Sequence, residues 1–252
     1  GSNQWGQLGR GDTNTTGDDP NEMGDNLIAV NLGTGAEVSD MALGEVHSCA
    51  LLTSGNVKCF GKNDKGQLGL GDNDNRGGSA SDLGDALPAV NFGTGLTATA
   101  LTAGCQHSCA LLSNGAVKCF GYNNYGQLGQ GTTDNSGDEP GEMGDNLPAV
   151  DLGGAVVTGI AAGCDFTCAL TDDGSVMCWG RNTWGQLGTG DGEDRLDGTN
   201  EVLVAVDLDD STARDISAGE AHVCALMDDS SVKVGRNNHG QLGLGDEEDR
   251  GD

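Results

Sequence analysis

The sequence predicts an all-β protein built from copies of one repeated unit, and two observations support this fold class. The tetrapeptide Gly-Gln-Leu-Gly recurs at spacings of 60, 60, 59 and 55 residues, beginning at Gly6, Gly66, Gly126, Gly185 and Gly240. Glycine supplies 45 of the 252 residues without a Gly-X-Y period, and the apolar residues fall in short runs of Val, Leu and Ala. This composition favours many short strands joined by tight turns, and the long repeat indicates one supersecondary unit copied in tandem.

The centre of each unit is predicted to be a β-hairpin, because two short apolar runs surround a glycine-bearing turn. In the first unit the runs cover residues 44–51 and 57–61. A three-residue loop that ends in a left-handed Gly55 makes Leu52 face Asn56, and two pairs further on Cys49 faces Cys59. The same counting predicts directly opposed cysteines in the next two units: Cys109 with Cys119, and Cys168 with Cys178.

Two further strands are expected in each unit. A short strand precedes each Gly-x-x-His run, for instance at residues 38–43 and 156–161. An outer strand is expected where the long loop ends, at residues 27–32, 87–92, 147–152 and 204–208. Proline has no N–H to donate to a ladder, so Pro88 and Pro148 are tolerable only at a sheet edge or at the start of a strand. Four strands in each of several tandem units predict β-propeller blades.

Residues 61–72 (Gly-Lys-Asn-Asp-Lys-Gly-Gln-Leu-Gly-Leu-Gly-Asp) and residues 180–190 resemble the repeat of the regulator-of-chromosome-condensation family. The resemblance covers essentially the whole chain and implies a β-propeller, commonly seven-bladed, of which about four blades of ~60 residues lie here. We expect one domain, with a partial blade followed by four repeats, the last incomplete: residues 1–32, 33–92, 93–152, 153–208 and 209–252. Because the chain opens in mid-repeat, we also expect it to be part of a longer or processed protein.

The nine cysteines favour a disulfide framework over free thiols, because the three opposed pairs recur in independent copies. Cys105 and Cys164 occupy equivalent sites in neighbouring units and either bridge two blades or remain free, and Cys224 has no partner in this register. A zinc site is disfavoured, because the spacing is Cys-x9-Cys. Disulfides predict an oxidising compartment, either extracellular, at the cell surface or in an organelle lumen such as the thylakoid lumen, and not the nucleus.

The charge of the chain restricts its partners. Thirty-nine Asp and Glu face 12 Lys and Arg, a formal net charge of −27, which excludes nucleic acid and anionic membranes and favours a protein with a basic surface. The excess acid lies in insertions at residues 12–26, 72–85, 132–146 and 191–201. The predicted contact residues lie in two of these insertions: Asp18, Asp19, Glu22, Asp25, Asp138, Glu139, Glu142 and Asp145.

No cofactor, metal or small-molecule substrate is expected. Asp12, Asn14 and Asp72 resemble fragments of a calcium loop, but Met23 stands where a bidentate Glu is needed, so solvated turns are the better interpretation. His47, His107 and His222 belong to the repeat, and Phe166 replaces them in the third copy, which indicates a structural hydrogen bond between strands rather than shared chemistry.

The sequence therefore predicts a non-catalytic protein-binding or scaffold module, a subunit or accessory protein of a larger assembly, that presents acidic propeller loops. Two alternatives remain open. The family resemblance implies a guanine-nucleotide exchange factor-like regulator of a small GTPase, and the acidic turns leave a calcium-binding extracellular repeat protein. An enzyme is not expected, because no Ser/His/Asp constellation or phosphate-binding loop stands out.

Overall fold

The computed structural model describes residues 1–198, 201 and 203–234. These residues form four three-stranded antiparallel sheets, in which strand order follows chain order. We call them the first to fourth blades. Their strands are β1 Val38–Leu43, β2 His47–Leu52 and β3 Val57–Gly61; β4 Ala98–Ala103, β5 His107–Leu112 and β6 Val117–Gly121; β7 Val157–Ala162, β8 Phe166–Thr171 and β9 Val176–Gly180; β10 Ala213–Ala218, β11 Val223–Met227 and β12 Val232–Val234. Short 3-10 turns lie in the long loops: η1 Gly24–Asn26, η2 Ala80–Asp82, η3 Gly84–Ala86 and η4 Gly144–Asn146.

The hairpin registers predicted from the sequence are confirmed. Cys49 pairs with Cys59 between β2 and β3, and the two neighbouring blades repeat this pairing. The Leu52 amide donates to the Asn56 carbonyl (2.9 Å), which makes that pair hydrogen-bonded. Because antiparallel pairs alternate, Cys49 and Cys59 fall at a non-hydrogen-bonded position, where opposed side chains lie closest. The first strand of each unit also forms as expected, one residue later than predicted in the third blade.

The prediction of a fourth, outer strand is wrong. Residues 27–32, 87–92, 147–152 and 204–208 are not strands, and each described blade has three. In the segment 87–92 the Val90 amide donates one hydrogen bond to the Val57 carbonyl of β3 (2.8 Å), but no ladder of such bonds follows. Pro88 lacks a donor, and the Leu32 and Phe92 carbonyls accept from the Nζ atoms of Lys58 and Lys118.

The recurring Gly-Gln-Leu-Gly motif forms a tight corner after each hairpin. Gly66 has φ +75°, and a Cβ there would lie 2.4 Å from the Asp138 amide nitrogen, so only glycine fits. Leu68 is fully buried, and its amide donates to the Asn63 side chain (2.9 Å). The motif is therefore conserved between the copies by backbone geometry and packing. Its fifth copy, at Gly240, lies outside the described residues.

Apolar side chains pack between neighbouring blades. The forward face of a blade is the one toward the next blade in the chain, and the backward face is the one toward the preceding blade. Side chains alternate between these faces along each strand. Cys49 and Leu51 on the forward face of β2 pack in one cluster with Ala98 and Leu112 of the second blade. Equivalent clusters join the second blade to the third and the third to the fourth.

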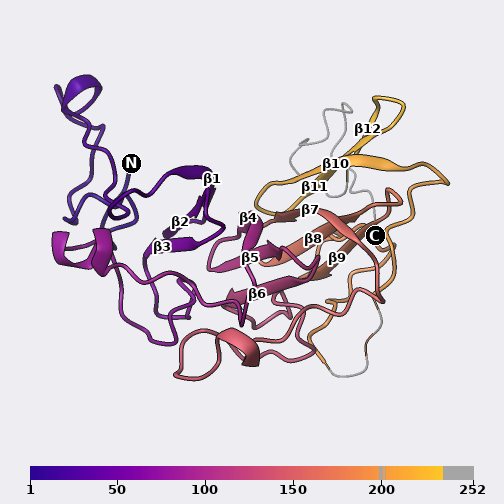
Figure 1. The fold of residues 1–252 in the computed structure, drawn as a ribbon. Coiled ribbons are helices and arrows are strands. Elements are labelled where there is room, and N and C mark those ends of the chain that lie inside the picture. Colours follow the sequence, from indigo (N-terminus) through magenta and orange to yellow (C-terminus); the bar gives the residue numbers. More distant parts are fainter. Residues whose placement is uncertain (199–200, 202, 235–252) are drawn as a thin grey trace.

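The blades stand in a row, with their innermost strands β1, β4, β7 and β10 adjacent in this order. Figure 1 shows the first and fourth blades at opposite ends of this row. The 3-10 turns near residues 80–86 and 144–146 lie away from the innermost strands, at the outer rim (Figure 1). The described residues thus form an open arc of propeller blades, with a channel side and a rim side.

Candidate functional site

Two of the blade junctions are joined by a buried histidine. His47 Nε2 lies 2.8 Å from Ser108 Oγ on the next blade, and His107 Nε2 lies 2.9 Å from Thr167 Oγ1. The Ser108 hydroxyl itself donates to the Gln67 carbonyl (3.1 Å), so it must accept from the imidazole. His47 is therefore the Nε2–H tautomer. The bond joins strands of two different sheets and is structural.

Burial keeps both imidazoles neutral. Loss of hydration lowers the pKa of His47 to about 4 and that of His107 to about 3. The Nδ1 atoms of both rings are buried and have no hydrogen-bond partner. A proton added there would be costly, so these groups are poor general bases at neutral pH.

The junction between the third and fourth blades replaces this pair with an apolar one. Phe166 stands where the other units have histidine, and its ring lies over Gly163 as the His107 ring lies over Gly104. It packs in one cluster with Val223, which stands where the other units have Ser or Thr. Both members of the pair change together, although they lie on different blades. In the sequence, valine at residue 223 in place of Ser or Thr indicates this pairing. Sequence reasoning missed it, because residues 166 and 223 lie far apart in the chain and only the fold brings them together.

The structure brings the predicted cysteine pairs together. Disulfides join Cys49 to Cys59, Cys109 to Cys119 and Cys168 to Cys178, each with a Cα–Cα distance of 4.1 Å. A fourth disulfide joins Cys105 to Cys164 (Cα–Cα 4.4 Å) and so links the second blade to the third. Cys224 is the free cysteine of the described residues, and burial raises the pKa of its thiol.

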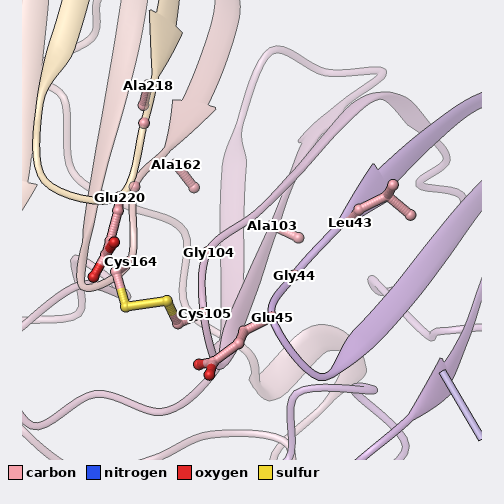
Figure 2. Close-up of a pocket in the computed structure, with 12 residues that line it drawn as sticks. Leu43, Gly44, Glu45, Ala103, Gly104, Cys105, Ala162, Cys164, Ala218 and Glu220 are labelled. Carbon is pink, nitrogen blue, oxygen red and sulfur yellow. A yellow bond between two sulfur atoms is a disulfide. The ribbon is translucent and has the colours of Figure 1, made fainter. Parts of the chain in front are cut away.

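A shallow cavity of about 530 Å³ lies at one end of the innermost strands. The Cys105–Cys164 disulfide lines this cavity, and Figure 2 shows the Glu45 and Glu220 side chains on either side of the bridge. The remaining lining is mainly glycine and alanine. The Cys164 amide donates to the Glu220 carbonyl (2.8 Å), and this hydrogen bond joins the third blade to the fourth beside the cavity.

Two of the predicted contact residues instead hold the acidic loops in shape. Glu22 Oε2 accepts the amides of residues 17, 18 and 19 at 2.7–3.1 Å. Glu142 Oε2 accepts the amides of residues 137, 138 and 139 at 2.8–3.1 Å in the same way. Hydrogen bonds from the Asp19 and Gly17 amides are the main causes that lower the pKa of Glu22. The carboxylate thus organises the loop around itself.

Asp145 is also engaged within the protein. Its carboxylate accepts from the Thr94 amide (2.8 Å) and hydroxyl (2.9 Å), and these bonds lower its pKa. Asp85 binds Thr34 identically one repeat earlier. The nearby Lys118 ammonium donates to the carbonyls of Phe92 and Gly144, and burial lowers its pKa. Sequence reasoning missed these lysines, because only the fold brings them to the carbonyls.

The other predicted contact residues remain at the surface. Asp18, Asp19, Asp25 and Glu139 are exposed, whereas Asp138 is half-buried. Burial, followed by the Glu142 charge, raises the Asp138 pKa. Of the eight predicted contact residues, some therefore hold the loops in shape through hydrogen bonds within the protein, and others stay exposed. Binding of a partner by the exposed carboxylates stays a prediction.

The calcium-loop fragments fold as local turns. The Asp12 carboxylate accepts the Asn14 amide (2.8 Å), and Asp72 accepts the Asp74 amide (2.9 Å) while it also pairs with Arg76 (2.7 Å). Within the described part of the chain, no group of three His, Cys, Asp or Glu side chains could hold a metal ion. Calcium binding stays untested.

Two family models match the repeats in register with the blades. One matches residues 38–67, 98–127 and 157–186, and the other matches residues 54–111, 114–170 and 173–226. Both describe the regulator of chromosome condensation (RCC1) repeat. The chain belongs to the RCC1 repeat family. The longer model spans the turn of one blade and the central strand of the next, so it follows the hairpins and the junctions described above.

Relatives of known name support the RCC1 assignment. The chain is 32% identical over 254 residues to the ultraviolet-B receptor UVR8 of Arabidopsis thaliana, covering 99% of this chain and 51% of UVR8. The structure of human WBSCR16 has a TM-score of 0.74 at 22% identity, covering 100% of this chain and 60% of that one. Yeast RCC1 (Prp20), solved bound to Kap60, has a TM-score of 0.62 at 26% identity, covering 82% of this chain and 45% of that one. The chain thus spans about half the length of UVR8 and somewhat more of WBSCR16, and it has the RCC1 propeller fold.

Among the described residues, no helix is long and apolar enough to cross a membrane.

Proposed function

We propose that this RCC1 repeat chain is a non-catalytic protein-binding module that presents preorganised acidic loops to a basic partner in an oxidising compartment. The observation that carries the proposal is that some carboxylates of the acidic loops hold the loop backbone in shape while others stay exposed. Glu22 and Glu142 each bind three backbone amides, whereas Asp18, Asp19 and Glu139 remain exposed beside them. Loops fixed in this way lose little conformational entropy when a partner binds.

The charge balance supports the same conclusion. The net charge is −27, and several of the 12 basic side chains are already bound within the protein, for instance Lys58 and Lys118. A surface of this sign attracts a basic protein at long range and accelerates their association, more so at low salt. The four disulfides support an oxidising location, because such bonds persist mainly outside the cytosol and nucleus.

The test compares two triple variants of equal charge. The loop variant carries Asp18→Asn, Asp19→Asn and Asp25→Asn and keeps Glu22, which the loop needs. The control carries Glu37→Gln, Asp172→Asn and Asp210→Asn, three exposed carboxylates elsewhere. Binding of a fluorescent oligolysine peptide is measured by anisotropy at low and near-physiological salt, with oligoglutamate as the blank.

We expect the loop variant to bind about 3–10-fold more weakly than wild type, and the control to change by less than about 2-fold. Equal weakening in both variants would mean that net charge alone attracts the peptide. The proposal of a loop site would then be rejected.

A regulator of a small GTPase is the second candidate, and family membership is the observation that favours it. Yeast RCC1 is solved bound to Kap60, a protein partner, which suits either candidate. Accelerated release of labelled GDP from a small GTPase would favour this role. The disulfides and the acidic surface favour the binding module.

A further inference from the structure

One of the disulfides differs from the others in its access to solvent. The three hairpin disulfides are buried, and each of their cysteines is at most 1% exposed. Cys105 and Cys164 are half-buried, and both line the cavity of about 530 Å³ at the end of the innermost strands. A thiolate has to reach a sulfur atom of a disulfide to attack it, so access decides which bond exchanges. Among the disulfides of the described residues, Cys105–Cys164 alone offers this access in the folded chain.

This access belongs to an internal junction of the blade row. Cys105 precedes β5 of the second blade and Cys164 precedes β8 of the third, and the first and fourth blades lie beyond them on either side. The cavity wall next to each cysteine is an Ala-Gly pair, at residues 103–104 and 162–163. Side chains this small cannot cover the sulfur atoms, so the bridge stays open to the cavity between complete neighbouring blades.

The surroundings of this disulfide are acidic. Glu45 and Glu220 stand where the second and third blades have Cys105 and Cys164, and Figure 2 shows their side chains on either side of the bridge. Both glutamates are exposed, and none of the described residues that line the cavity is basic. A negative field of this kind repels an anionic thiol and attracts one that carries positive charge.

We propose that the Cys105–Cys164 disulfide is a thiol–disulfide exchange site whose reductant is a positively charged thiol, in the cell a dithiol on a basic protein surface. The attacking thiolate forms a mixed disulfide with one sulfur atom and releases the other as a thiolate, which takes up a proton. The second thiolate of the reductant then displaces the first sulfur atom, which is protonated in turn. Two electrons and two protons pass to the chain, which ends with two thiols, and the reductant ends as a disulfide.

The junction between the second and third blades can lose this bond and stay assembled. The His107–Thr167 hydrogen bond, the bond from the Ala162 amide to Thr102 and the apolar cluster between the blades involve neither cysteine of the bridge. The hairpin disulfides of the two blades are buried and stay closed. Reduction therefore loosens the two blades at the cavity and leaves each blade intact.

The first experiment reduces the folded chain after the free Cys224 has been blocked. Newly formed thiols are alkylated at successive times and assigned by peptide mass, while circular dichroism checks that the sheets persist. We expect Cys105 and Cys164 to be labelled at least about 10-fold faster than the hairpin cysteines, which a thiol reaches only when a blade opens. Equal labelling rates, or a bridge that resists reduction until the chain unfolds, would overturn the exchange site.

The second experiment compares three thiols at equal thiolate concentration: cationic mercaptoethylamine, uncharged mercaptoethanol and anionic mercaptopropionate. At low salt we expect the cationic thiol to open the bridge about 10-fold faster than the anionic one, because the carboxylates around the cavity steer the approach. The difference should fade at about 0.5 M salt, where charges are screened within a few ångströms. Equal rates with all three thiols at low salt would overturn the assignment of a positively charged reductant.

Matched variants separate the charge beside the bridge from the charge of the whole chain. Glu45→Gln with Glu220→Gln removes the two carboxylates at the cavity, and Glu37→Gln with Asp172→Asn removes two exposed carboxylates elsewhere. We expect only the first variant to bring the rates of the cationic and anionic thiols together. A chain whose Cys105 and Cys164 are alkylated before any reductant is added would overturn the proposal as a whole.

Discussion

The junction between the second and third blades and the junction between the third and fourth have the same backbone geometry but different chemistry. The first of these holds the His107–Thr167 hydrogen bond, the Cys105–Cys164 disulfide and a bond from the Ala162 amide to Thr102 Oγ1 (2.9 Å). The second instead has Phe166 and Val223 in one apolar cluster. Both junctions keep a main-chain bond at the end of the innermost strands, from the Cys105 amide to the Cys164 carbonyl (3.1 Å) and from the Cys164 amide to the Glu220 carbonyl (2.8 Å). The position between blades therefore tolerates a polar pair or an apolar pair, provided that both partners change.

The largest loss of stability is expected when a polar residue is placed on one side of the apolar junction and the other side is left unchanged. Phe166→His alone removes a fully buried aromatic ring and places an imidazole beside Val223, whose side chain cannot accept a hydrogen bond from it. We expect a loss of about 3–5 kcal/mol in the free energy of unfolding, measured by chemical denaturation.

A second substitution serves as the control for this prediction. Val223→Thr, added to Phe166→His, recreates the His107–Thr167 pair and should recover about 1–3 kcal/mol. Val223→Thr alone should have a small effect, because its hydroxyl can donate to the Gln186 carbonyl as the Thr167 hydroxyl donates to the Gln127 carbonyl, whereas its acceptor side would meet the Phe166 ring. If the two effects simply add, the positions are not coupled and the pairing rule fails.

The inter-blade disulfide should have the next largest effect. Cys105 and Cys164 are 59 residues apart, whereas the hairpin pairs are 10 apart. In the chain-entropy model the longer loop gives the larger stabilisation, about 4 kcal/mol against about 3 kcal/mol. Replacing Cys105 and Cys164 together by serine should therefore lower stability more than replacing Cys109 and Cys119.

Mass after alkylation checks the premise of this comparison. Without reductant, one cysteine per wild-type chain should react after denaturation, and all nine should react after reduction. Several reactive cysteines in the unreduced chain would remove the basis for the oxidising compartment. Equal losses in the two double variants would instead contradict the chain-entropy argument.

The residues that were predictable from the sequence are those governed by local geometry. The turn at residues 53–55 sets the hairpin register, and from there the pairing of Cys49 with Cys59 is a matter of counting. The bridge between Cys105 and Cys164 stayed open, because it depends on the distance between two blades rather than on any turn.

The prediction of an outer strand was wrong for a related reason. Its apolar pattern resembles a strand, but Lys58 and Lys118 capture the carbonyls that a ladder would need, and these contacts arise only in the folded chain. The acidic loops were located from the sequence, yet the roles of Glu22 and Asp145 were not. A carboxylate that binds three amides looks the same in a sequence as one that faces solvent.

The smallest of the three expected effects is the pH dependence of the free energy of unfolding, which, of the two junctions, only the one that contains His107 should show through its blade-to-blade pair. His107 has a pKa near 3 when folded and an ordinary value near 6.5 when unfolded, so the unfolded chain binds a proton first as pH falls. Its contribution is complete above pH 6.5 and is lost as pH falls toward 3. By pH 4 the loss from this residue is about 3 kcal/mol. The Phe166–Val223 pair has no titratable group, so this pair itself adds no pH dependence to the stability.

The matched variant converts one junction into the other. His107→Phe with Thr167→Val copies the Phe166–Val223 pair into the junction between the second and third blades. Carboxylates titrate in the same range, but they are common to both proteins, so the difference between the two denaturation midpoints isolates the imidazole. We expect this difference to shift in favour of the variant between pH 6.5 and pH 4, because wild type alone loses the His107 contribution. Parallel midpoints over that range would mean that the His107 imidazole is hydrated in the folded chain, and the blade junction would then be open to water.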